Sequence, residues 1–281
     1  MKSFINYNGR LLDEQEPVIK SADRSYRYGD GVFETIRVWK SKILFAELHV
    51  ERLMVSLQTL KINLPKLVTP ERLKNEIMEL CGRNKCEDDA RVRLSISRGA
   101  GGLYDSDDSF QYLIECSTLP GTAGRLNENG LVIDVFPHAR KSIDIFSNLK
   151  SSNYLPYVMA ALYAKEKKLN DCLLLNIHDR ICDATIANIF WVKNNTVFTP
   201  LLSEGCVAGV MRRYLIEKLA STGQSLREEE LGISILENAD EVFLTNAVYG
   251  IRWVKQFREN VYDNKISEKL YKEIVLPNFE S

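Results

Sequence analysis

A solitary lysine stands in the sequence FSNLKSSNYL, residues 146–155. Lys150 has small polar neighbours and no acidic residue within five positions on either side. A lysine is a nucleophile only as the neutral amine, and its reference pKa is about 10.4. Desolvation or a nearby cation lowers that pKa and allows a Schiff base with an aldehyde. By position alone, Lys150 is either such a nucleophile or an ordinary surface lysine in a loop.

Two further charged residues stand beside apolar stretches. Asp183 lies in RICDATIANIFW, residues 180–191, just before a strongly apolar segment. It is either a turn or cap residue or a carboxylate that pairs with the cation of a buried ligand. Arg52 lies in HVERL, residues 49–53, on or beside the buried face of a predicted helix. A partly buried arginine there is a phosphate clamp, a snorkelling side chain or half of an ion pair.

The glycine-rich and cysteine-containing segments give weaker signals. Gly209 precedes a predicted helix, and the backbone N–H groups of a helix start favour an anion. Neither YGDGVFE nor RGAGG completes a dinucleotide fingerprint or a P-loop. The six cysteines have no C-x-x-C spacing and no histidine near enough in sequence to suggest a zinc site, which predicts free buried thiols and no metal site. Folding could still gather distant ligands; the cysteines are Cys81, Cys86, Cys116, Cys172, Cys182 and Cys206.

The periodicity of apolar residues predicts the elements that position these side chains. Asn8-Gly9 predicts a hairpin turn, and the alternation over 31–45 predicts two strands joined near Lys40. Helical spacing predicts helices over 46–62, 154–169 and 209–223, with strands between and around them. Strands and helices mix without strict alternation, which predicts an α+β (mixed α/β) fold of two domains. We place a small domain at 1–119, a linker at 120–130 and a larger domain at 131–281.

Composition excludes several classes of partner. With 37 basic and 38 acidic residues the net charge is −1, so no nucleic-acid or anionic-membrane footprint is expected. The N-terminus lacks the apolar core of a signal peptide, and no run approaches the length of a membrane span. A cytoplasmic protein with a small-molecule ligand is therefore expected.

The order of the motifs is more specific than any one of them. DRSYRYGDGVFETIRV, HVERL, LKSSNYL, DATIANIFWV, TVFTP, GVMRR and EVFLTNAVYGIRWV occur in that order between residues 23 and 254. This series closely resembles the class IV aminotransferase family, which includes branched-chain and D-amino-acid aminotransferases and aminodeoxychorismate lyase. The resemblance implies fold type IV, with a smaller N-terminal α/β domain and a larger, barrel-like mixed α/β domain. It also implies pyridoxal 5′-phosphate as cofactor, an amino-acid-like substrate and a homodimer.

The resemblance implies a role for each matching residue. Lys150 matches the lysine that forms the Schiff base with the cofactor and then shuttles a proton. Asp183 stands where family members usually carry a glutamate for the pyridine nitrogen. The phosphate would be held by Arg52 and by backbone at Val210 and Met211. Three further positions match residues around the cofactor, namely Val207, Asn246 and Ala247, and a substrate carboxylate could be held by Arg93 or Arg98, for which structural pairing is the alternative.

The departures from the family pattern bear on the reaction. Met211 and Ala247 replace two threonines usual in aminotransferases, as in some aminodeoxychorismate lyases. The arginine-x-histidine motif of D-amino-acid aminotransferases is absent, and so is the tyrosine-x-arginine motif of branched-chain enzymes. The first hypothesis is therefore a 4-amino-4-deoxychorismate lyase releasing pyruvate and 4-aminobenzoate. The alternatives are a branched-chain-type aminotransferase using 2-oxoglutarate and, more remotely, a degenerate non-catalytic cofactor-binding protein.

Overall fold

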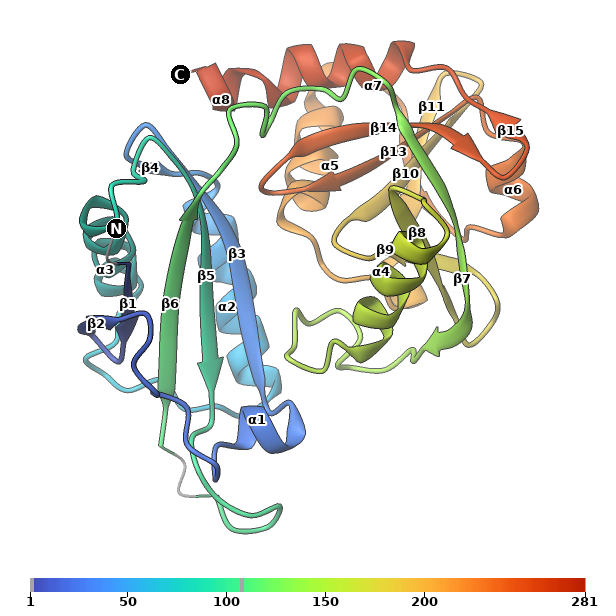
Figure 1. The fold of residues 1–281 in the computed structure, drawn as a ribbon. Coiled ribbons are helices and arrows are strands. Elements are labelled where there is room, and N and C mark those ends of the chain that lie inside the picture. Colours follow the sequence, from blue (N-terminus) through green and yellow to red (C-terminus); the bar gives the residue numbers. More distant parts are fainter. Residues whose placement is uncertain (1–2, 107–108, 281) are drawn as a thin grey trace. The chain divides into compact units, whose positions relative to one another are not determined.

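The computed structural model in Figure 1 describes residues 3–106 and 109–280. Its chain forms two compact units. The first comprises Met1–Ala123 with Leu149–Asn153, and the second comprises Gly124–Asn148 with Tyr154–Ser281. Within the described residues, no helix has the length and apolar character that crossing a bilayer requires.

The first unit is an antiparallel sheet packed against helices. Its strands run in the order β2-β1-β6-β5-β3-β4. Their bounds are β1 Phe4–Tyr7, β2 Arg10–Asp13, β3 Gly31–Trp39, β4 Lys42–Ile43, β5 Asp89–Ser97 and β6 Gln111–Thr118. The helices are α1 Arg24–Tyr28, α2 Ala46–Thr59 and α3 Pro70–Arg83. Apolar side chains of α2, α3, β3, β5 and β6 form one buried core.

Two tight turns shape this sheet as the sequence predicts. Asn8 and Gly9 both have positive φ, 53° and 82°, and join β1 to β2. Lys40 and Ser41, at 45° and 60°, join β3 to β4 in the same way. Two successive residues of positive φ match the right-handed twist of the strands, so these turns fix the hairpin registers.

Residues 149–153 extend the sheet at β3. The Phe33 N–H donates to the Lys150 carbonyl at 2.9 Å, and the Ser152 N–H donates to the Gly31 carbonyl at 2.9 Å. Lys150 therefore takes its position from the first unit, although sequence places it in the range assigned to the larger domain. The boundaries drawn from sequence remain a prediction.

The second unit has a mixed sheet of nine strands. Along the sheet the order is β12-β11-β10-β13-β14-β7-β8-β9, and β15 pairs with β14. The bounds are β7 Leu131–Lys141, β8 Asp171–Asn176, β9 Ile181–Ala184, β10 Asn188–Lys193, β11 Thr196–Pro200, β12 Leu226–Glu229, β13 Glu241–Asn246, β14 Gly250–Phe257 and β15 Asn260–Val261. β7 runs parallel to both β8 and β14, while the hairpin β10–β11 is antiparallel.

Helices and short turns complete the second unit. They are α4 Leu155–Glu166, η1 Leu202–Glu204, α5 Val210–Thr222, α6 Ile233–Glu237, α7 Lys265–Leu270, η2 Tyr271–Val275 and α8 Pro277–Glu280. α4 packs its small and aromatic face, Tyr157, Ala160 and Ala164, on a core that includes Cys172 and Leu174 of β8. The two units together confirm the predicted mixed α/β class.

Candidate active site

In the first unit, the predicted phosphate clamp lies beside a buried carboxylate. Arg52 Nε donates to Glu34 Oε1 at 2.9 Å, and its Nη2 donates to Oε2. His49 Nδ1 lies 2.7 Å from the same Oε2. The i, i+3 spacing puts His49 and Arg52 on one side of α2, where both meet Glu34 of β3. Glu34 thus fixes the direction of the Arg52 guanidinium.

The charges of this cluster are set by burial and pairing. Burial raises the pKa of Glu34, but the charge of Arg52 and the hydrogen bond from His49 outweigh it and lower the pKa to about 2. Burial lowers the pKa of His49. The imidazole is therefore neutral at neutral pH and donates its Nδ1–H to the carboxylate. Sequence analysis did not select Glu34, because an acidic residue is unremarkable among the alternating polar and apolar residues of a predicted strand.

Lys150 lies close to this cluster. Its side chain is half-buried, with Nζ 4.6 Å from the centroid of the Phe33 ring. Burial is the main cause that lowers the pKa of His49, and the positive charges of Arg52 and Lys150 lower it further. The structure therefore brings two residues selected from sequence, Lys150 and Arg52, to the same region of the first unit.

The two arginines considered for a substrate carboxylate have different surroundings. Arg93 places its guanidinium carbon 3.7 Å from the centroid of the Phe33 ring, the ring that Lys150 also contacts. Arg98 donates from Nε to Asp30 Oδ2 at 3.0 Å, and its Nη1 and Nη2 donate to backbone carbonyls after α2. Those contacts support the structural alternative for Arg98, whereas Arg93 and Lys150 each lie near the Phe33 ring.

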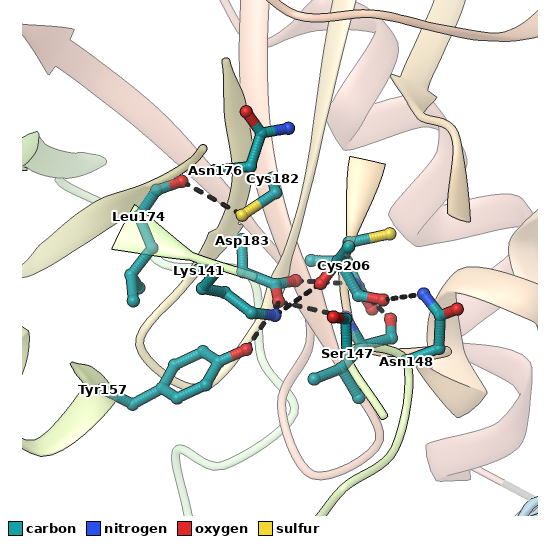
Figure 2. Close-up of polar contacts among 12 residues, drawn as sticks. Lys141, Ser147, Asn148, Tyr157, Leu174, Asn176, Cys182, Asp183 and Cys206 are labelled. Atoms are coloured by element: carbon teal, nitrogen blue, oxygen red, sulfur yellow. Dashed lines mark hydrogen bonds and ion pairs between the residues drawn. The ribbon is translucent and has the colours of Figure 1, made fainter. Parts of the chain in front are cut away.

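In the second unit, Asp183 of β9 accepts four hydrogen bonds (Figure 2). Its Oδ2 accepts from Lys141 Nζ at 2.7 Å, Tyr157 Oη at 2.8 Å and the Val207 N–H at 3.0 Å. Its Oδ1 accepts from Asn188 Nδ2 at 3.1 Å. Asp183 is only 1% exposed, so these partners replace its water shell.

Lys141 is the counter-ion of this carboxylate. Its Nζ also donates to the Gly205 carbonyl at 2.6 Å. Burial by itself lowers the pKa of Lys141, but the attraction of Asp183 outweighs it and raises the pKa above the ordinary value. Burial and the nearby Asp183 charge raise the pKa of Tyr157 well above its usual range, so the phenol keeps its proton. Sequence analysis missed both residues, because they are 42 and 26 positions from Asp183.

A helix start lies next to this carboxylate. The first backbone N–H groups of α5, at Val210 and Met211, have no acceptor within the helix. Asn188 connects this helix start to Asp183, because a Cβ added at Gly209 would lie only 1.8 Å from Asn188 Oδ1. Position 209 must therefore be glycine, because Asn188 lies too close for a side chain. The N–H groups at the start of α5, which can bind an anion, thus lie near the carboxylate of Asp183.

β13 contributes a buried hydroxyl without a partner. Thr245 Oγ1 has no hydrogen-bond partner among the described residues, although Thr245 is 2% exposed. β13 packs against α5, and Thr245 pairs with Asn188 in the sheet. Asn246 instead accepts from the N–H groups of Val248 and Tyr249, which closes a turn. Ala247 is buried in the same turn.

Comparison with known proteins identifies the family of the chain. Residues 31–257 match the family described as Amino-transferase class IV. An aminodeoxychorismate lyase of Vibrio harveyi is 31% identical over 82% of this chain and 83% of its own length. The chain belongs to the class IV aminotransferase family. Members of this family are pyridoxal-phosphate-dependent enzymes that act on amino-acid-like substrates, so the resemblance drawn from the motifs is confirmed.

Two further relatives extend the comparison. A protein of Methanocaldococcus jannaschii, provisionally named a branched-chain-amino-acid aminotransferase, is 30% identical over 94% of this chain and 91% of its own length. The branched-chain aminotransferase of Thermoproteus uzoniensis, solved with norvaline, has a TM-score of 0.88 at 24% identity. It covers 100% of this chain and 97% of its own, which confirms fold type IV.

Each of the two units has side chains or backbone groups that are chemically suited to a phosphorylated pyridine. In the second unit Asp183 is an acceptor, α5 offers N–H groups, and Thr245 has an unused hydroxyl. A carboxylate oxygen has two lone pairs, and Asn188 occupies one on Oδ1, so one further donor can be accepted. In the first unit Lys150 offers an amine and Arg52 a cation.

Replacing Glu34 with glutamine is expected to lower the free energy of unfolding by about 3–5 kcal/mol, because the charge of Arg52, whose side chain is 11% exposed, then loses its buried counter-ion. Urea denaturation at neutral pH measures this loss. Since the folded-state pKa of Glu34 is about 2, its contribution is present at neutral pH and lost as the pH falls from the ordinary glutamate range toward 2. The variant should lack that part of the acid-induced loss.

Glu47→Gln is the matched control for Glu34→Gln. It removes an exposed carboxylate that pairs with Lys74 at 2.6 Å, and a surface pair contributes at most about 1 kcal/mol. Equal stability losses in the two variants would contradict the buried-pair interpretation.

Replacing Lys141 with methionine should also destabilise the cofactor-free protein by about 3–5 kcal/mol, since Asp183 keeps a buried charge. Because the folded-state pKa of Lys141 is raised, this contribution is complete at neutral pH and is lost only as the pH rises through that value. Urea denaturation of the two cofactor-free proteins gives the difference. Lys193→Met breaks a half-exposed pair with Asp240 and should cost at most about 1 kcal/mol. A Lys141 variant as stable as the Lys193 variant would sink the idea.

Proposed function

We propose that this chain binds pyridoxal 5′-phosphate and releases pyruvate from 4-amino-4-deoxychorismate, leaving 4-aminobenzoate. The ion pair between Lys141 and Asp183 is the observation that carries the choice of a lyase. When bound, the cofactor supplies an aldehyde for covalent attachment and a ring that accepts electrons. Lys150 would serve the covalent attachment, and Asp183 would interact with the electron-accepting ring.

Asp183 would accept a hydrogen bond from the ring nitrogen through Oδ1. Its negative charge is already shared with Lys141 at 2.7 Å, so it holds a proton on that nitrogen less strongly than an unpaired carboxylate would. The pyridine ring is then a weaker electron acceptor. Loss of pyruvate that creates an aromatic ring is driven by the product and tolerates weak withdrawal better than transamination does. The pair therefore favours elimination.

Lys150 would hold the cofactor and later move a proton. Its Nζ would take the proton from the carbon that bears the substrate amine and return a proton when the product leaves. Arg52, kept in direction by Glu34, and the N–H groups of Val210 and Met211 would bind the phosphate. Val207 would pack on the ring.

Three residues complete the proposed site. Thr245 Oγ1 is the hydroxyl available to the phosphate, because Met211 and Ala247 stand where aminotransferases usually have threonines. Asn246 would hold the turn that carries Ala247. Arg93, at the Phe33 ring that Lys150 also contacts, is the candidate for a substrate carboxylate.

The name of the Vibrio harveyi relative supports the lyase, and that of the Methanocaldococcus jannaschii relative supports a second candidate. That candidate is transamination of a branched-chain amino acid with 2-oxoglutarate. Supplying 4-amino-4-deoxychorismate and, separately, leucine with 2-oxoglutarate distinguishes the two. Pyruvate and 4-aminobenzoate from the first mixture alone support the lyase. Glutamate from the second mixture at the higher rate would replace it with the aminotransferase.

Lys150→Ala should abolish turnover, because Lys150 is the residue assigned to hold the cofactor and carry the proton. The wild type should be yellow, and borohydride should fix the cofactor covalently, which mass spectrometry detects on the peptide containing residue 150. The variant should lose this adduct while keeping its circular dichroism spectrum. Lys167→Ala, at a half-exposed surface lysine after α4, should retain both the adduct and the activity. An adduct that persists in the Lys150 variant would rule out its assigned role.

We also extend the homodimer of the family to this chain. α4 carries an exposed apolar stripe at helical spacing, formed by Leu155, Val158, Met159 and Leu162 with exposures of 66%, 47%, 45% and 56%. A stripe of this kind on a folded surface is typical of an interaction face. Because the family resemblance implies a homodimer, we take a second copy of the chain as the partner of this stripe. We also propose that the protein is located in the cytoplasm.

Leu162→Lys should shift the protein from the dimer to the 32.1 kDa monomer, because it places a charge in the stripe. Multi-angle light scattering measures the mass. Glu166→Lys, at an exposed position near the end of the same helix, should remain dimeric. A wild-type protein of monomer mass, or a Leu162 variant that stays dimeric, would contradict the assignment of α4 to the interface.

A further inference from the structure

Three cysteines that are scattered in the sequence meet in the first unit. The Sγ atoms of Cys81, Cys86 and Cys116 all lie within 4.8 Å of one another. Cys86 Sγ and Cys116 Sγ are 3.5 Å apart. Cys81 and Cys86 are 0% and 3% exposed, and Cys116 is half-buried. None of the three cysteines is among the residues assigned to the cofactor, and the proposed function does not use them.

The fold itself holds the three sulfurs together. Cys81 lies in the last turns of α3, and the chain then turns sharply, with the Cys86 N–H donating to the Cys81 carbonyl at 3.0 Å. Cys116 comes from β6, an interior strand of the sheet, where it pairs with Val92 of β5. Two of the ligands therefore come from one helix end and the third from a strand that the helix covers. Such a site is preorganised before any ion arrives.

Asn84 fixes the direction of a donor toward this group. Its Oδ1 accepts from the Phe4 N–H at 2.9 Å, and its Nδ2 donates to the Phe4 carbonyl at 2.8 Å. This pairing with β1 settles which end of the amide carries the N–H groups. The same Nδ2 lies 3.1 Å from Cys116 Sγ. An amide donor aimed at sulfur is the kind of outer-shell partner that stabilises a metal-bound thiolate.

The spacing of the sulfurs suits one metal ion. With metal–sulfur bonds of about 2.3 Å, three thiolates around one ion are separated by about 3.8–4.0 Å. The observed upper limit of 4.8 Å and the single distance of 3.5 Å bracket that value. Small side-chain rotations would complete the geometry, because the ligands already converge.

We propose that Cys81, Cys86 and Cys116 form a three-thiolate site for a soft cation, with cuprous ion bound more tightly than zinc. Thiolate ligands select cuprous ion and zinc among the common metals. Structural zinc sites almost always have four protein ligands, whereas this group contains three thiols and, in the part of the chain that is described, no histidine or carboxylate. Cuprous ion accepts three sulfur ligands without a fourth. The expectation of no metal site, drawn from cysteine spacing, is replaced by this proposal.

The test uses the reduced, metal-free full-length chain under nitrogen. Cuprous ion alone and zinc alone are titrated in separate experiments with a competing chelator, followed by ultraviolet thiolate-to-metal absorption and elemental analysis. We expect one cuprous ion per chain and weaker binding of zinc. Cys116→Ala should weaken cuprous binding by more than about 100-fold, since loss of only an outer-shell partner costs roughly 10–100-fold. Asn84→Ala should fall in that smaller range.

Cys172→Ala is the matched control, because Cys172 is a buried free cysteine of the second unit outside the group. It should retain wild-type affinity, and so should Lys150→Ala, which separates this site from the proposed catalysis. Circular dichroism confirms that each variant is folded. The proposal is overturned by a reduced wild type that binds no cuprous ion, by tighter binding of zinc, or by equal losses in the Cys116 and Cys172 variants.

Discussion

A buried carboxylate must be supplied with hydrogen-bond donors, and Asp183 imposes that constraint on much of the second unit. Its four partners come from β7, α4, β10 and the loop before α5. Removing any of them leaves a charge or a polar group in a dry environment, which costs more than the bond itself contributes. The two strands, the helix and the loop are thus joined through a single side chain, whose contacts with Lys141 and Tyr157 are drawn in Figure 2.

The first unit also contains a buried carboxylate with hydrogen-bond donors, but here the carboxylate positions a cation. Glu34 takes its two partners from α2 and so fixes a cation rather than an acceptor. Desolvation alone would raise the pKa of Glu34, but the arginine at hydrogen-bond distance overrides it. An arginine whose direction is fixed in this way loses little side-chain entropy when it binds an anion. Both buried carboxylates therefore preorganise groups assigned to the cofactor.

The cysteine group follows a different rule, because its members are brought together by packing and not by ion pairs. Cys81, Cys86 and Cys116 are small enough to be packed in the core of the first unit, and their proximity results from how α3 covers β6. The spacing of the cysteines predicted free buried thiols and no metal site, although folding could still gather distant ligands. Spacing along the chain carries no information on a ligand that arrives from another strand, which is why the group was not expected.

The sequence by itself determined the family, the hairpins at Asn8-Gly9 and Lys40, and the helices that carry Arg52 and Met211, because local periodicity and turn chemistry encode them. It also selected Lys150 and Asp183 through the order of short motifs. Only the tertiary structure decided that Lys150 pairs with β3 and that Asp183 is neutralised by Lys141, 42 residues away. Those contacts depend on long-range strand pairing and on burial, which determine the electrostatics of a site. Neither produces a periodic pattern in the amino-acid sequence.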